Sequence, residues 1–271
     1  MQTVRPAAIA GHFYPAQASA LKQLVLTLLG QVAEPEHGVG EVPKAILVPH
    51  AGYIYSGATA ALAYARLRPG RECIRRVVLL GPAHRVHVKG LALPGASSFT
   101  TPLGEVTIDQ DARDALVRLP QVLISEAAHA AEHSLEVQLP FLQCVLGDFK
   151  LLPLLAGDVG APAVAEVIES LWGDDETLIV ISTDLSHFLP YAQAQVTDQA
   201  TLQHILQLDA SLTHHQACGG TPVNGFLLAA RQHRLCPHLL GACNSGDSAG
   251  DKRRVVGYAS VAFVPQVHHG H

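Results

Sequence analysis

The chain has 271 residues, of which 48% are hydrophobic and 15% are charged, and its formal net charge is −5. This composition predicts a folded protein with a large apolar core and excludes a disordered chain. A nucleic-acid partner is not expected, because neutralising phosphates needs clustered Lys and Arg side chains and the sequence has no basic block. We expect a cytoplasmic protein with no membrane partner. No apolar run approaches the roughly 20 residues of a spanning helix, and the first residues lack the apolar core of a signal peptide.

In chain order, apolar strands alternate with helical patterns, which is typical of an α/β fold. We expect a helix over 17–29, a strand over 45–48, a helix over 58–66, a strand over 77–80, helices over 110–119 and 132–145, a strand over 151–155, a helix over 163–171, a strand over 178–181, helices over 192–208 and from near 222, and a last strand over 255–264. Pro153 indicates an edge position or a bulge for its strand, and Pro140 is expected to bend or split its helix.

The cysteine and histidine content narrows the kinds of site that the chain can hold. Five cysteines without a C-x-x-C pair argue against a disulfide framework or a four-thiolate zinc site. Three of the sixteen histidines lie in the last five residues, so residues 266–271 are predicted to be a flexible, His-rich tail that can scavenge metal adventitiously. Residues 1–265 show no repeat or linker and are predicted to form one domain.

Three of the predicted strands end in short polar turns that carry His or Asp. The run AILV leads to His50, VVLL leads to His84, and LIVI leads to Asp184 and His187. Ligands of open α/β sheets bind beyond the carboxyl ends of the strands, so these side chains converge if the three strands are parallel and adjacent. Imidazole and carboxylate are common ligands of iron, zinc, manganese and copper. Each histidine taken alone is explained as well by packing and hydrogen bonding.

The segment AEHSLEVQLPFLQC carries a further candidate. Glu132, His133 and Glu136 are spaced so that they could share one helical face. His133 would then support the metal ligands or line a substrate pocket. The structural alternative is a solvated helix start with glutamate at its favourable end.

The last loop, GACNSGDSAGD, is dense in Gly, Ser and Asp, a composition that predicts turns. It follows an apolar strand, so Asp247 or Ser248 could reach the same site, and Cys243 could supply a thiolate. A purely structural loop explains the composition equally well.

Taken in order, these motifs resemble the Memo-like family, known in prokaryotes as AmmeMemoRadiSam system protein B. The matching stretches run from Arg5 to Ser260 and are Arg5-Pro6 with AGHFYP, PHAGYIYSG, GPAH, TTPLGEV with Asp109, EHSLEVQLPFL, STDLSH, CGGTPV and GDSAGDKRRVVGYAS. No single motif is decisive, but the ordered set is highly specific and covers essentially the whole chain.

The resemblance implies a single α/β domain with a mixed, mostly parallel central sheet flanked by helices, similar to class III extradiol dioxygenases, which bind non-haem iron. By that likeness His50 and His84 are the imidazole ligands, His187 is an acid/base histidine beside them, and Asp184 is a functional carboxylate. The resemblance also implies partners from a radical-SAM system.

The third ligand departs from the pattern of the animal relatives, in which a cysteine of the last loop completes the metal site. Counting back from VVGYAS puts Ser248 at that position. We therefore expect Asp247 to take the role that a glutamate plays in the dioxygenases, with Cys243 and Ser248 as alternatives.

The residues and the resemblance together predict a mononuclear Fe(II) redox enzyme of dioxygenase-like type, with copper or zinc as alternative metals. The substrate, a small molecule or a peptide, is unknown. His187 would shuttle a proton, since an ordinary histidine pKa near 6.5 suits that role. Aromatic residues are expected to wall the pocket, although core packing explains them nearly as well; they are Phe13, Tyr14, Tyr53 and Tyr55. Two other functions fit the same residues: a non-catalytic peptide- or anion-binding adaptor, and a metal-dependent hydrolase.

Overall fold

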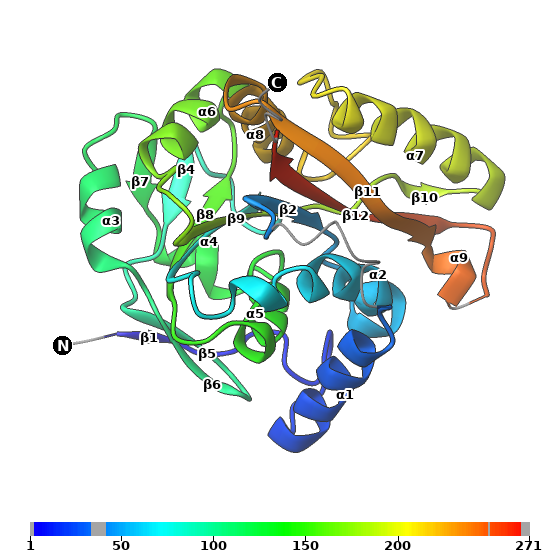
Figure 1. Cartoon of the computed structure of the whole chain (residues 1–271), viewed down its shortest axis with the longest axis horizontal. Helices are drawn as coiled ribbons and strands as arrows, with labels where there is room; N and C mark the ends of the chain where they lie inside the picture. Colours follow the sequence, from blue (N-terminus) through cyan, green and yellow to red (C-terminus); the bar gives the residue numbers. More distant parts are fainter. Residues whose placement is uncertain (1–2, 34–41, 249, 267–271) are drawn as a thin grey trace, which may run out of the picture.

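The computed structural model describes residues 3–33, 42–248 and 250–266, so the predicted tail lies outside the described residues beyond Gln266. Its central sheet has the strand order β10-β12-β2-β9-β3-β8-β4-β7, with β11 also paired to β12 (Figure 1). The strands are β2 (Ala45–Val48), β3 (Arg76–Pro82), β4 (Leu91–Leu93), β7 (Val122–Ile124), β8 (Lys150–Ala156), β9 (Thr177–Ser182), β10 (His187–Leu189), β11 (Leu235–Asn244) and β12 (Val255–Pro265).

The sheet is mixed, as predicted. Strands β2, β9, β3 and β8 form a parallel centre, whereas β12 pairs antiparallel with β2, β10 and β11. The prediction that the three site-bearing strands are adjacent and parallel is confirmed, because β9 lies between β2 and β3. Their carboxyl ends therefore meet at one edge of the sheet.

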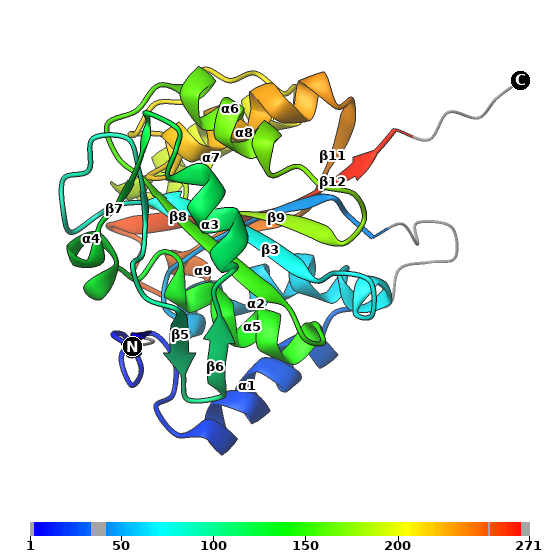
Figure 2. The same ribbon diagram turned by 90° about the vertical axis from the view of Figure 1, so that its left-hand side faces the viewer.

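Helices cover both faces of this sheet. Figures 1 and 2 show α1 (Ala18–Gly30), α2 (Tyr53–Ala65) and α5 (Leu139–Val145) on one face, and α6 (Ala161–Ser170), α7 (Tyr191–Leu206) and α8 (Gly220–Gln232) on the other. Side chains alternate along a strand, so Ile46 and Val48 join one core and Ala45 and Leu47 join the other. A strand buried on both faces explains the uninterrupted apolar run AILV.

The remaining elements are short. A small second sheet joins β1 (Val4–Arg5), β5 (Ser98–Thr101) and β6 (Gly104–Thr107) on the same side as α1 (Figure 2). The other helices are α3 (Gln110–Leu116), α4 (Glu126–Ala130) and α9 (Ser245–Ser248), with 3-10 turns η1 (Arg68–Gly70) and η2 (Glu136–Gln138). Within the described residues, no helix combines the length and apolar character that crossing a bilayer requires.

Of the two expectations about proline, the one for Pro153 is corrected and the one for Pro140 is confirmed. Strand β8 lies inside the sheet, between β3 and β4, and not at its edge. Its pairing with β4 involves only Leu155 and Ala156, so the missing N–H of Pro153 lies outside the β4–β8 pairing. The helix expected over 132–145 is divided into η2 and α5, and Pro140 sits in the first turn of α5. Proline is tolerated there because first-turn N–H groups lack a partner within the helix.

Candidate metal centre

Three histidines converge beyond the carboxyl ends of the parallel strands. His50 follows β2, His84 follows β3, and His133 lies in the loop between α4 and η2. One ligand atom of each lies within 4.8 Å of those of the other two. Nitrogens that share an ion lie roughly 3–4 Å apart, so the three ligand atoms lie near the separation that one ion requires. His50 is buried, His133 is half-buried and His84 is exposed, so the cluster opens to solvent on the His84 side.

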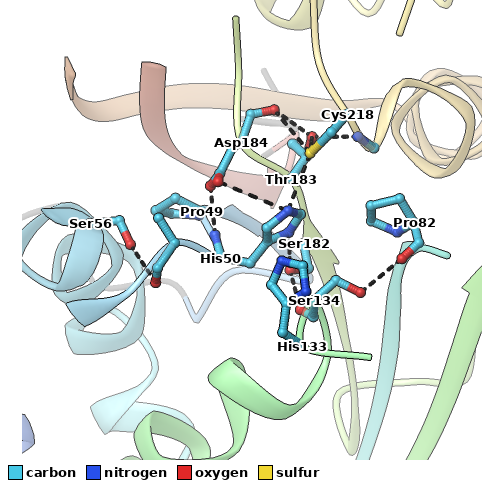
Figure 3. A network of polar contacts seen from close by, with 12 residues as sticks. Pro49, His50, Ser56, Pro82, His133, Ser134, Ser182, Thr183, Asp184 and Cys218 are labelled. Atoms are coloured by element: carbon cyan, nitrogen blue, oxygen red, sulfur yellow. Dashed lines mark hydrogen bonds and ion pairs between the residues drawn. The ribbon is translucent and has the colours of Figure 1, made fainter. Parts of the chain in front are cut away.

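The parallel register brings two of the predicted residues level with each other. Val48 pairs with Ser182, and His50 and Asp184 each follow two residues later. The backbone N–H of His50 donates to Asp184 Oδ1 at 2.7 Å, and Asp184 Oδ2 lies 4.0 Å from His50 Nε2 (Figure 3). The sheet itself therefore fixes the distance between this imidazole and this carboxylate.

The hydrogen bonds of Ser182 define which nitrogen of His50 carries the proton. Ser182 Oγ lies 2.6 Å from the Ser134 carbonyl oxygen, which only accepts, so the hydroxyl proton is used there. Ser182 must then accept from Gln138 Nε2 at 2.9 Å and from His50 Nδ1 at 3.0 Å. His50 is therefore protonated on Nδ1, which leaves Nε2 bare and able to bind a metal.

Burial keeps His50 neutral. Desolvation is the largest cause that lowers its pKa well below the usual value, and the nearby His84 and His133 rings add to it. A neutral imidazole is the form that ligates metals.

The buried carboxylate of Glu132 holds the other two histidines. Its Oε2 accepts the backbone N–H of His84 at 2.6 Å, and its Oε1 lies 2.9 Å from His84 Nδ1. The same Oε1 accepts the backbone N–H groups of His133 and Ser134. It also lies 3.1 Å from His133 Nδ1, but this contact does not have hydrogen-bonding geometry. Because Nδ1 of His84 faces this carboxylate, its Nε2 is left for an ion.

The charge of Glu132 is maintained by these contacts. Burial is the largest influence and by itself raises the pKa, but the contacts from His133 and His84 and the backbone N–H of Ser134 together hold the pKa far below its usual range. The same contacts keep residues 131–135 out of a helix, so the expectation that Glu132, His133 and Glu136 share one helical face is wrong. Glu136 instead accepts from Arg5 and Tyr14 in the core.

Asp184 lies on the turn after β9 beside His50, and His187 is the first residue of β10. Burial raises the pKa of Asp184 to about 7, against backbone N–H groups of His50 and Ala51 that lower it. His187 Nδ1 donates to the Leu185 carbonyl at 2.9 Å, which leaves its Nε2 free. Burial is the largest cause of a lowered His187 pKa, to which repulsion from His84 contributes.

The structure does not bring the three candidates of the last loop into the histidine cluster. Asp247 is exposed, and its carboxylate accepts from Tyr191 Oη at 2.6 Å and from the Asn244 N–H at 2.9 Å. The hydroxyl of Ser248 donates to the Ser245 carbonyl, and Cys243 Sγ lies 3.0 Å from Thr59 Oγ1. These groups complete the turn of α9 and a contact with α2, and the third imidazole of the cluster comes from His133.

The four aromatic candidates lie in different surroundings. The Phe13 ring packs 4.9 Å from the His133 ring, so it borders the cluster. Tyr14 and Tyr53 are buried, and their hydroxyls donate to Glu136 and to the Val137 carbonyl. Tyr55 is exposed on α2. Core packing therefore accounts for Tyr14 and Tyr53.

Cys218, which the sequence patterns did not single out as a site residue, also contacts the site. Its Sγ lies 3.2 Å from His50 Nε2 (Figure 3). Burial raises the pKa of the Cys218 thiol to about 12, so the thiol is protonated and donates to the bare nitrogen. In the sequence, Cys218 is marked by the two glycines that follow it in CGGTPV. The structure explains Gly219, because a Cβ there would lie only 2.8 Å from Thr183.

Comparisons with known proteins agree with this architecture. The crystal structure of an uncharacterised protein from Escherichia coli K12 is similar, with a TM-score of 0.52 at 14% identity over 82% of this chain and 99% of that chain. At this identity, the likeness shows a shared fold alone.

The similarity in sequence is closer and extends over nearly the whole chain. A MEMO1 family protein from Aquifex aeolicus is 37% identical over 273 residues, which cover 96% of this chain and 99% of that protein. MEMO1 family proteins from Ignicoccus hospitalis and Methanopyrus kandleri are 36% and 35% identical, each over 96% of this chain and 98% of the relative. The family model described as Memo-like protein matches residues 5–262. The chain therefore belongs to the Memo-like protein family.

Proposed function

We propose that this protein is a metal-dependent redox enzyme whose single divalent ion is held by His50, His84 and His133. The observation that carries the proposal is the convergence of three imidazoles within 4.8 Å, each with its Nδ1 facing a protein oxygen. Such partners orient a ring and raise its basicity as a ligand. Imidazole sets bind iron, copper and zinc, and the family likeness favours Fe(II).

The residues around the cluster have separate roles in this proposal. A bound ion would supply Lewis acidity and, where redox-active, electron transfer. Glu132 holds two rings with one charged carboxylate, and Asp184 positions His50 through its backbone N–H. His187, with Nδ1 tied to a carbonyl, has Nε2 free to take or give a proton at the substrate. The exposed side of His84 is the route for substrate entry.

A second candidate function is metal-dependent hydrolysis. Three histidines without a carboxylate are the ligand set of catalytic zinc in carbonic anhydrase, where the ion activates water. The cluster has this all-imidazole composition, whereas the two-His-one-carboxylate set expected from the sequence is typical of iron oxygenases. A non-catalytic adaptor has no comparable support, because anion binding does not require three converging imidazoles.

Metal analysis of protein ending at Gln266 and purified without oxygen tests the proposal, and removing the tail removes its three histidines from the count. We expect about one ion per chain, because a structural or catalytic set of three or four protein ligands retains its metal through purification. His84→Ala should lose the ion, and His233→Ala, on the surface beside Glu169, should keep it. Absence of metal, or equal content in both variants, would contradict the proposal. Iron with oxygen uptake supports the redox function, and zinc without it supports the hydrolase.

A further inference from the structure

We propose that Arg5 is a positioning residue of the metal centre that holds the loop carrying His133, an inference that rests on the proposed metal site. Arg5 is buried, and its guanidinium reaches three acceptors spread along one segment. Nε donates to the His129 carbonyl at 2.8 Å, Nη2 donates to the Glu132 carbonyl at 2.8 Å, and Nη1 donates to Glu136 Oε2 at 2.5 Å. One side chain therefore fixes the chain on both sides of His133.

His133 depends on this anchoring more than the other two histidines of the cluster do. His50 and His84 each have a hydrogen-bond partner for Nδ1, whereas Nδ1 of His133 has none in the described part of the chain. Neighbouring rings pack against it instead: the His84 ring stacks on it at 4.7 Å, and the Phe13 ring lies 4.9 Å away. The placement of the His133 backbone therefore decides where the third imidazole lies.

The carboxylate of Glu136 extends the connection along the N-terminal segment. Besides the guanidinium, it accepts from three further donors, which are the backbone N–H groups of Ala8 at 2.8 Å and Ile9 at 3.0 Å and the hydroxyl of Tyr14 at 2.6 Å. The segment that begins at Arg5 and the loop of His133 are therefore joined by one buried polar network. A change at Arg5 still leaves this carboxylate with three donors.

Arg5→Lys tests the guanidinium while keeping its charge. A lysine ammonium can still neutralise Glu136, so the variant should fold, but its single nitrogen cannot reproduce the planar fork that reaches three acceptors. The measurement is cobalt(II) affinity of the chain ending at Gln266, by competition with a chromophoric chelator, under conditions in which circular dichroism shows every protein to be folded. We expect the affinity to fall by roughly 10–100-fold, the usual effect of losing a group that orients metal ligands.

Arg76→Lys is the matched control. Arg76 also pairs with a buried carboxylate, that of Asp109 at 2.8 Å, but it begins β3 at the end opposite the metal centre, so its variant should bind cobalt as wild type does. Wild-type affinity in Arg5→Lys, or an equal loss in both variants, would overturn the positioning role and leave the histidine site standing. Absence of cobalt binding by the wild-type chain would overturn the metal site and this inference with it.

A second measurement uses the wild-type chain alone. If the N-terminal segment holds the loop in its metal-binding position, linkage requires the metal to stabilise that segment in return. Cobalt should therefore slow amide hydrogen exchange in a peptide that covers Ala8 and Ile9, whose N–H groups donate to Glu136, and leave exchange in α6 unchanged. Unchanged exchange in the N-terminal peptide of the cobalt-bound chain would overturn the positioning role even if Arg5→Lys did not fold.

Discussion

Glu132 contacts His84 at two points, accepting its backbone N–H at 2.6 Å through Oε2 and facing its Nδ1 at 2.9 Å through Oε1. The pair fixes both where the residue sits and which way its ring faces. The same carboxylate accepts the N–H groups of His133 and Ser134, so a single side chain joins the turn after β3 to the loop before η2.

Replacing this carboxylate by its amide should weaken metal binding without changing the ligands. Glu132→Gln keeps the shape but removes the charge, so we expect metal affinity to fall by roughly 10–100-fold, the usual effect of losing a group that orients metal-binding histidines. Competition with a chromophoric chelator measures the affinity. Glu166→Gln on α6 serves as the control and should match wild type, and an unchanged affinity in Glu132→Gln would show that Glu132 only supports the fold.

The identity of the third ligand is decided by comparing His133 with Asp247. His133→Ala should abolish stoichiometric metal binding, because it removes one of the three converging imidazoles. Asp247→Ala should retain the metal and lose only the hydrogen bonds to Tyr191 and Asn244. Metal content of the two purified variants is the measurement. The reverse order of effects would return the third position to the last loop.

His187 should affect turnover and leave the ion in place. Its Nδ1 is tied to the Leu185 carbonyl, and it is not part of the three-histidine cluster among the described residues. His187→Ala should therefore bind metal as wild type does. With a substrate in hand, turnover should slow by about 10²–10⁴-fold, the usual contribution of general acid/base catalysis. A variant that loses its metal would make His187 a ligand, and one that melts earlier but turns over normally would make it structural.

A different histidine should control stability in acid. Burial lowers the pKa of His129 from 6.5 to about 4, and the hydrogen bond to the Ala92 carbonyl opposes this only in part. Arg5 lies against it and disfavours its charge, while Glu132 favours it. The unfolded chain therefore binds a proton at a higher pH than the folded chain does.

The sign of the pH effect follows from this depressed pKa. Stability from neutral His129 is fully present above pH 6.5 and is lost as the pH falls from 6.5 towards 4, by about 3 kcal/mol at most for a shift of this size. Urea unfolding at pH 7 and pH 4 measures it. His129→Gln, which cannot titrate, should lose less stability over this interval than wild type. Equal losses would assign the acid sensitivity to other groups.

Local patterns in the sequence determined the parts of this molecule that depend on neighbouring residues. Short apolar runs predicted β2, β3 and β9, because a strand buried on both faces must be apolar at successive positions. The convergence of their end residues depended on the three strands being parallel and adjacent. The pairing of β9 with both β2 and β3 meets that condition and places His50, His84 and Asp184 at one edge. The apolar strand expected before the last loop lies within β11, but its length was not anticipated, since Pro237 and Gly241 interrupt its apolar pattern.

The completion of the site depends on contacts that no local pattern encodes. His133 was assigned to a helix because its spacing suits one, yet the Glu132 carboxylate binds the backbone N–H groups there and holds the segment as a loop. Cys218 meets His50 across 168 residues of sequence, through the docking of Gly219 on Thr183. The sequence by itself determined the central strands, the family and two of the histidines, because periodicity and ordered motifs are properties of the chain. Only the tertiary structure decided the third imidazole and the nearby thiol, because their positions depend on how distant loops pack against the ends of the sheet.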